Sequence, residues 1–269
     1  PDLSGYIARH YVFSADLPAD AEMIEYLLAE TPFIRLLLGG TWHGETAPDQ
    51  WTNPGPALFF GPNGHPFKVR VRGSFRVIGM ALRPSGWRAL SDISAHVHAD
   101  CMVPLFDLWG DRAEALLRDV TAIAGDDDAS DAAVVAALEH HVAALLEERG
   151  RKAPDRAMQR FEQIARNEST ALVRDVADRL GLGQRSLERR CQATFGMGPK
   201  AVLRRSRFLD MASAIRGLSD LGEHPLAASN PTYQGKWVSG FSATTKVLRS
   251  DFGLKRGIPL VSDEVRIDI

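Results

Sequence analysis

The chain has 269 residues, 45% of them hydrophobic and 25% charged, which is the composition of a globular protein with room for two domains. No apolar run approaches the ~18 residues of a membrane span, and no secretory hydrophobic segment opens the chain, so we expect a cytoplasmic protein. The two cysteines, Cys101 and Cys191, are far apart, which argues against a disulfide framework and against a cysteine zinc site.

The small net charge of −2 conceals an asymmetry between the two halves of the chain. Residues 1–150 carry 11 Lys/Arg and 21 Asp/Glu, whereas residues 151–269 carry 21 Lys/Arg and 13 Asp/Glu. A basic half attracts a polyanion such as DNA, and an acidic half is repelled by it. The division predicts two domains, residues 1–150 and 151–269, with a linker at residues 150–155 around Pro154.

The first part of the chain is predicted to form one short helix followed by strands. Residues 19–28 have apolar side chains at helical spacing. Compact apolar runs at 33–38, 57–60, 67–71 and 75–82 predict strands, because turn residues separate them. In the run 67–72 the alternation is strict, so Phe67, Val69 and Val71 should face a core. Several short strands divided by turns predict a small β-barrel or sandwich.

Helices are predicted after residue 84, at 85–90, 105–109, 111–124 and 131–149. Ser130 is placed to cap the last of these helices and Gly150 to end it. The apolar stripe of this helix, which includes Val134, Leu138 and Val142, is wide enough to bury against its own domain or against a partner. The fold class predicted for the chain is therefore α+β, with strands first and an all-α region after them.

A helical hairpin is predicted between Leu172 and Phe195. Leu172, Val176, Ala177 and Leu180 share one face of a first helix, with Ser169 or Thr170 placed to cap it, and Gly181 allows a sharp turn. The second helix turns Leu187, Cys191 and Phe195 inward, and Arg185, Glu188, Arg189 and Gln192 outward. This pattern fits a helix-turn-helix DNA reader, and it also fits an ordinary hairpin with a solvated charged face.

The residues that follow the hairpin favour the DNA-binding interpretation. Gly196-Met197-Gly198-Pro199 ends the second helix and restarts the chain, and a linking helix is predicted at 203–218. Between Arg185 and Arg216 there are eight basic residues and two acidic ones. Side chains early in a reading helix reach base edges, whereas neighbouring cations hold phosphates. The candidates for base readout are Arg185, Ser186, Glu188 and Arg189, and those for phosphate contact are Gln184, Arg190, Lys200, Arg204 and Arg205.

These residues resemble the first DNA-binding unit of the AraC/XylS transcriptional regulators. The match comprises Val176-Ala177, Gly181-Leu182-Gly183, Leu187-Glu188-Arg189, Gly196-Met197-Gly198-Pro199 and Arg207. Gly183 replaces the usual capping Ser, which should weaken the start of the second helix, and Cys191 replaces the usual Phe. The resemblance implies a sequence-specific regulator that is not an enzyme and needs no cofactor. It further implies double-stranded DNA, a second copy of the chain and RNA polymerase as partners.

The family resemblance also implies a second helix-turn-helix unit, at residues 236–259. Gly240-Phe241-Ser242-Ala243 resembles the family's turn, but Pro225 and Asn230-Pro231 disfavour the helix that should precede it. The second unit is therefore predicted to be divergent. Its candidate DNA contacts are Thr244, Thr245, Lys246 and Arg249.

Residues 55–90 and 103–117 resemble the cupin-like N-terminal domain of one group of these regulators, which implies an effector-sensing or dimerisation domain. Polar-tipped rings near the turns suggest an effector pocket at Trp42, His43, Trp51 and His65. No metal site is predicted, because His96 and His98 would point to opposite faces of an extended segment. The alternative function is a ligand-binding or enzymatic cupin-like protein whose helical C-terminal domain contacts protein. We expect an activator, although no feature of the sequence distinguishes activation from repression.

Overall fold

The computed structural model describes residues 2–27, 31–47, 49–65, 67–125, 130–150, 152–215, 244–248 and 264–268. The chain divides into two compact units, Pro1–Asp220 and Leu221–Ile269. The fold is α+β, with antiparallel sheets first and helices after them, as the sequence predicts. No helix within the described ranges has the length and apolar character needed to cross a membrane.

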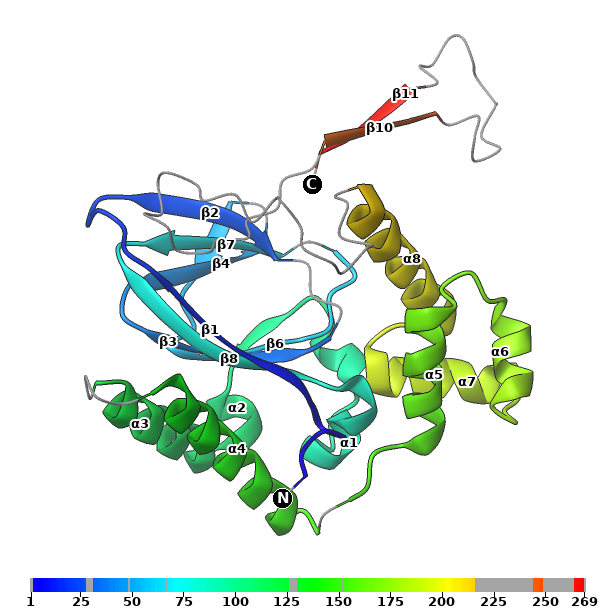
Figure 1. The fold of residues 1–269 in the computed structure, drawn as a ribbon, viewed down its shortest axis with the longest axis horizontal. Helices are drawn as coiled ribbons and strands as arrows, with labels where there is room; N and C mark the ends of the chain where they lie inside the picture. The colour runs from blue at the N-terminus through cyan, green and yellow to red at the C-terminus, as the bar shows by residue number, and fades with distance from the viewer. Residues whose placement is uncertain are drawn as a thin grey trace. The chain divides into compact units, whose positions relative to one another are not determined.

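Two antiparallel sheets form the N-terminal part of the first unit (Figure 1). The five-stranded sheet has the order β1 (Ile7–Ala15), β8 (Phe75–Leu82), β3 (Phe33–Leu38), β6 (Ala57–Phe60) and β9 (Met102–Pro104). The four-stranded sheet has the order β2 (Glu22–Leu27), β7 (Phe67–Arg72), β4 (Thr41–Ala47) and β5 (Gln50–Thr52).

The two sheets are separate and do not close into a barrel, which leaves the sandwich as the predicted arrangement that the structure shows, and the chain passes from one sheet to the other at Gly39-Gly40. Both glycines have positive φ, 92° and 72°, which a side chain would disfavour. They separate β3 from β4, and these two consecutive strands belong to different sheets. The arrangement is therefore a pair of sheets instead of a closed barrel.

Because side chains alternate between the two faces of a strand, the five-stranded sheet contributes to two hydrophobic cores, one on each of its faces. Helices α2 (Phe106–Trp109), α3 (Asp111–Ala124) and α4 (Asp131–Glu148) cover one face of the five-stranded sheet (Figure 1). Ile34 and Leu36 of β3 pack in the core on this side, with Leu138 and Val142 of α4. Phe33 packs in a second core, which holds the inward residues of the four-stranded sheet. The stripe of α4 is thus buried in its own fold, which removes it as a dimer contact.

The predicted helix at 19–28 is wrong, because residues 22–27 form β2, which pairs antiparallel with β7. Met23 and Leu27 pack in the core between the sheets, whereas Ile24 and Tyr26 are 44% and 60% exposed. The apolar spacing fits a helix equally well, and the backbone hydrogen bonds offered by β7 decide the outcome. The strands at 33–38, 57–60 and 75–82 have the predicted bounds.

The helical predictions after residue 84 are confirmed with small shifts. Residues 85–90 form a short 3-10 turn, η1 (Pro84–Gly86), and α1 (Trp87–Leu90). The Ser130 side chain caps α4 by accepting a hydrogen bond from the Ala133 amide, as predicted. His141 of α4 is buried, with 5% exposure, and its Nε2 lies 3.0 Å from Asp119 Oδ2 on α3.

The two cysteines are expected to differ in reactivity. Cys101 is exposed, whereas Cys191 is buried in the helical core, where burial raises the pKa of its thiol. A thiol reacts as the thiolate, so Cys191 should be inert in the folded protein. Titration of the native chain with an aromatic disulfide reagent should consume one thiol, and titration of the unfolded chain should consume both. Rapid modification of both thiols in the native protein would contradict this burial.

Candidate nucleic-acid interface

Four helices form the C-terminal part of the first unit: α5 (Arg156–Asn167), α6 (Val173–Arg179), α7 (Gln184–Phe195) and α8 (Pro199–Ile215). Their shared core contains the predicted inward residues Val176, Ala177, Leu187, Cys191 and Phe195. The Phe195 ring meets the Phe161 ring of α5 edge-on, at a centroid distance of 5.2 Å. Leu172 is the exception, because it is 55% exposed at the start of α6. The core fixes α7 against both α5 and α8.

Gly181 makes the turn between α6 and α7, as predicted. Its φ is +64°, in the left-handed region that favours glycine. The Leu182 amide donates to the Ala177 carbonyl and the Gly181 amide donates to the Asp178 carbonyl, which together are the hydrogen bonds of a Schellman motif. The turn between the two helices is therefore short and hydrogen-bonded, as a helix-turn-helix requires.

Helix α7 begins and ends where the sequence predicts, whereas the predicted cap of α6 is not the one observed. Gly183 precedes α7 without a side-chain cap, and Gly196, with φ of +75°, ends the helix before Pro199 restarts the chain. The linking helix, predicted at 203–218, begins at Pro199 and is described to Ile215. Ser169 does not cap α6; its hydroxyl donates to Asp210 Oδ2 at 2.6 Å, and Leu172 occupies the cap position.

The first two turns of α7 present an uncovered polar face. Gln184, Arg185, Glu188 and Arg189 are exposed, and Ser186 is half-buried. Within the described residues, neither Arg185 nor Arg189 is held by a carboxylate. The Glu188 carboxylate lies close to Gly198, where an added Cβ would come within 2.3 Å of Oε1. Both arginines are consequently available to an external acceptor.

The predicted phosphate contacts separate into two groups. Lys200 and Arg204 are exposed in the first turns of α8, the helix that follows α7 in the chain. Arg190 instead lies 3.2 Å from Asp155 Oδ2, and Asp155 also caps α5. Arg205 donates to the carbonyl of Asn63 at 3.1 Å. Because both of these guanidiniums already have partners inside the first unit, Lys200 and Arg204 remain the better placed phosphate contacts.

A buried carboxylate connects α5 to the sheet region, and the sequence analysis did not identify it. Glu162 is 8% exposed and accepts hydrogen bonds from Arg83 at 3.0 Å, Ser85 at 3.2 Å and Arg166 at 2.8 Å. Arg83 and Ser85 follow β8 in the sheet region, whereas Arg166 lies one turn further along α5. The sequence feature that could have indicated this buried carboxylate is the position of Glu162 between Phe161 and Ile164, which are both buried.

The second predicted DNA-reading unit is not helical where the structure describes it. Thr244, Thr245 and Lys246 lie in β10 (Thr244–Leu248), which pairs antiparallel with β11 (Glu264–Asp268). β-branched residues at three of the five positions favour a strand over the helix that the family resemblance implied. Arg249 and the remainder of 236–259 lie outside the described residues.

The structure does not bring the four predicted effector residues into one pocket. Trp42 is 5% exposed in the core between the sheets. Trp51 lies on the other face of the four-stranded sheet, where Arg70 sits 4.0 Å from its ring centre, and His43 pairs in register with Arg70. His65 is exposed in a loop beside Asp100. Alternation in β4 therefore separates Trp42 from its neighbour His43.

His96 and His98 lie in a 3-10 turn, η2 (Ala95–His98), and not in an extended segment. His98 packs edge-on against Phe59 and Trp87, and burial lowers the pKa of its imidazole. Among the residues that the structure describes, no three His, Cys, Asp or Glu side chains converge on a point that could hold a metal.

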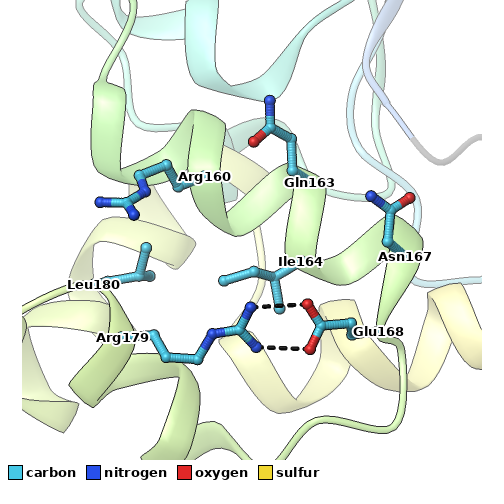
Figure 2. A pocket seen from close by; sticks show the side chains of 7 residues that line it. All are labelled: Arg160, Gln163, Ile164, Asn167, Glu168, Arg179 and Leu180. Atoms are coloured by element: carbon cyan, nitrogen blue, oxygen red, sulfur yellow. Dashed lines mark hydrogen bonds and ion pairs between the residues drawn. The ribbon is translucent and has the colours of Figure 1, made fainter.

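A polar pocket of about 260 Å³ lies between α5 and α6 (Figure 2). Arg179 and Glu168 cross it as a bidentate pair, with distances of 2.7 and 2.8 Å, and this pairing lowers the pKa of the Glu168 carboxyl. Arg160, Gln163 and Asn167 complete its polar lining. The Glu168 carboxylate and the Arg179 guanidinium already neutralise each other. Neither of these two charges is therefore free to bind a ligand in the pocket.

No family model and no curated protein matches the sequence. Among solved structures, ToxT from Vibrio cholerae O395 is 12% identical, with a TM-score of 0.43 over 83% of this chain and 86% of ToxT. Unsaturated fatty acid-bound ToxT from V. cholerae strain SCE256 is 8% identical, with a TM-score of 0.43 over 81% and 83%. The AraC-like transcriptional activator CuxR is 15% identical, with a TM-score of 0.30 over 68% and 69%. Likenesses at this level assign neither a ligand nor a DNA site to the chain.

Proposed function

We propose that the chain is a DNA-binding transcriptional regulator of the AraC/XylS type, in which α7 enters the major groove. The observation that carries the proposal is the exposed polar face formed by the first two turns of α7. A major groove admits one helix, and the side chains of its first turns reach the base edges. The supporting core of α5, α6 and α8 leaves this face free.

Three of the four candidate base-reading residues have distinct roles in this proposal. Arg185 forms a bidentate contact with a guanine, and Arg189 contacts a second guanine one turn further along α7. Glu188 accepts a hydrogen bond from a cytosine amino group. Lys200 and Arg204 bind phosphates and fix the register of the helix on the duplex.

The sheet region is the effector-binding part of the proposed regulator, and two copies of the chain bind one operator. Arg83, Ser85 and Glu162 connect this region to α5, which supports α7. Contact with RNA polymerase belongs to the same proposal. Because the apolar stripe of α4 is buried in the core, the proposed dimer surface lies elsewhere.

Selection of binding sites from random duplex DNA, followed by footprinting, tests the proposal. We expect one enriched motif and a protected region of about one groove per subunit, since residues 244–248 of the second predicted unit form a strand and not a helix. A variant with both Arg185 and Arg189 changed to Ala should enrich no motif, while an Arg118→Ala variant on α3 should enrich the same motif as the native chain. Failure of the native chain to enrich any motif would favour the alternative, a ligand-binding protein whose helical part contacts protein.

A further inference from the structure

The edges of the two described sheets differ in how far they invite pairing with another strand. β9 and β5 have three residues each, and β9 ends at Pro104. β1 has nine residues, but its pairing with β8 shifts register between Ile7 and Arg9. β2 has six residues and pairs with β7 without a shift (Figure 1). Short and bulged edges resist the addition of a strand, so β2 is the edge best suited to it.

Alternate residues of β2 turn their backbone groups away from β7. The Gly73 amide donates to the Ala21 carbonyl at 3.2 Å, which continues the register of β2 with β7. In an antiparallel ladder every second residue bonds to the neighbouring strand. Ala21 and every second residue after it therefore bond to β7, and the N–H and C=O groups of Glu22, Ile24 and Tyr26 point to the open edge. Within the described ranges, no backbone group pairs with them there.

The side chains of the same residues make this edge apolar on its outer face. Ile24 and Tyr26 are 44% and 60% exposed. Glu22 shares their face, but its carboxylate lies 3.4 Å from Arg70 Nε and 3.1 Å from Arg72 Nη2, and both arginines belong to β7. Unpaired charges on an edge strand prevent association. The charge of Glu22 is paired within its own sheet, so it does not protect the edge in this way.

We propose that β2 pairs antiparallel with β2 of a second copy of this chain, which joins the two four-stranded sheets into one. Residues with open backbone groups must meet, so Ile24 faces its own copy and Glu22 faces the second copy's Tyr26. The alternative register that pairs Ile24 with Tyr26 would place Glu25 opposite Glu25, and like charges directly opposite each other are destabilising. A twofold axis at Ile24 uses the edge of each copy once, so assembly ends at a dimer.

The charges are complementary in this arrangement. The register of β2 with β7 places Arg72 beside Glu22 and Lys68 beside Tyr26. A row across the joined outer face therefore contains Arg72 and Glu22 of one copy, followed by Tyr26 and Lys68 of the second copy. Each Glu22 lies between a cation of its own chain and a cation of the other, and Ile24 packs against Ile24 at the axis. Only the use of this dimer on DNA rests on the proposed function; the strand pairing does not.

Sedimentation of the full chain over a range of concentrations tests the pairing. We expect a reversible dimer. Ile24→Lys places two like charges opposite each other and should raise the dissociation constant about 10-fold or more. Ile24→Pro removes an N–H that β7 does not use, which an edge strand tolerates, and it should weaken the dimer similarly. Phe106→Lys is the matched control, because Phe106 on α2 is 48% exposed and lies outside this edge.

Two results of this experiment would overturn the proposal. The first is a native chain that stays monomeric at every concentration. The second is a dimer whose dissociation constant is unchanged in both Ile24→Lys and Ile24→Pro. Because the Ile24 side chain is exposed, we expect both variants to fold; if Ile24→Pro does not, Ile24→Lys alone decides.

Hydrogen exchange of the Tyr26 amide identifies what covers the edge. This amide should exchange slowly in the dimer and rapidly after dilution or in Ile24→Lys, because its bond crosses to the second copy. Slow exchange that does not depend on protein concentration would assign the edge to another segment of the same chain and overturn the proposal.

DNA binding by the same preparations separates the strand pairing from the proposed function. The native chain should bind a duplex with two copies of the selected motif more tightly than a duplex with one. Ile24→Lys should lose this difference and bind the single motif as the native chain does. A dimer that Ile24→Lys dissociates, in a chain that binds no DNA, would contradict the regulator and support the strand pairing.

Discussion

Replacement of Arg185 by alanine is expected to weaken binding of the selected DNA site by about 1–3 kcal/mol, the value of one bidentate base contact. Arg185 lies on the exposed first turn of α7 and has no carboxylate partner within the described part of the chain. Truncating it therefore removes an external contact without leaving an internal charge unpaired. Fluorescence anisotropy with labelled selected and random duplexes measures the effect.

The comparison of the two duplexes decides whether Arg185 reads a base. Arg185→Ala should lower affinity for the selected duplex more than for the random duplex, and preference at one base pair should relax. Lys200→Ala is the matched control, since loss of a phosphate contact weakens both duplexes alike. An equal loss on both duplexes in Arg185→Ala would reassign this residue to phosphate binding.

Replacement of Glu162 by alanine is expected to lower the free energy of unfolding by about 2–3 kcal/mol. Glu162 is 8% exposed and accepts from three side chains. Its loss leaves the hydroxyl of Ser85, which is 1% exposed, without an acceptor. Arg83 and Arg166 are 29% and 50% exposed, so water compensates part of their loss and keeps the cost below that of a fully buried pair. Urea unfolding measures the change.

Glu168→Ala is the matched control for this measurement. Glu168 forms a bidentate pair with Arg179, but the two side chains are 49% and 47% exposed, so solvent screens the pair and its loss should change the stability little. Glu162→Gln, which keeps a side-chain acceptor for Ser85, should fall between the two alanine variants. If Glu162→Ala lowers the free energy of unfolding no more than Glu168→Ala does, the Glu162 carboxylate does not hold α5 to the sheet region.

Local sequence patterns predicted the hairpin better than they predicted the sheets. Gly181 and Gly196 mark backbone positions with positive φ, and the inward spacing of Leu187, Cys191 and Phe195 follows from helix geometry alone. In contrast, β1 was missed, because a strand that alternates weakly between half-buried residues has little periodicity to detect. β2 was misread because its pairing with β7 is a tertiary effect.

Residues with long-range partners were hardest to predict. Arg190 and Arg205 follow a basic pattern that resembles a phosphate-binding surface, yet Asp155 and the Asn63 carbonyl bind them. Arg35 and Trp42 meet across two sheets, so sequence distance conceals their relation. The signal for Arg35 was a charge within the apolar run 33–38, and that for Glu162 was a charge beside an apolar helix face.

The salt dependence of DNA binding tests the central claim, that α7 and α8 present a DNA-binding surface. Each neutralised phosphate contributes about −0.9 to the slope of the logarithm of affinity against the logarithm of salt concentration. The exposed cations Lys200 and Arg204 alone therefore predict a slope of about −2 per subunit on the selected duplex. The account predicts that this slope becomes shallower by about 1 in Lys200→Ala. A flat salt dependence, or a steep one that the substitutions on α7 and α8 leave unchanged, would contradict it.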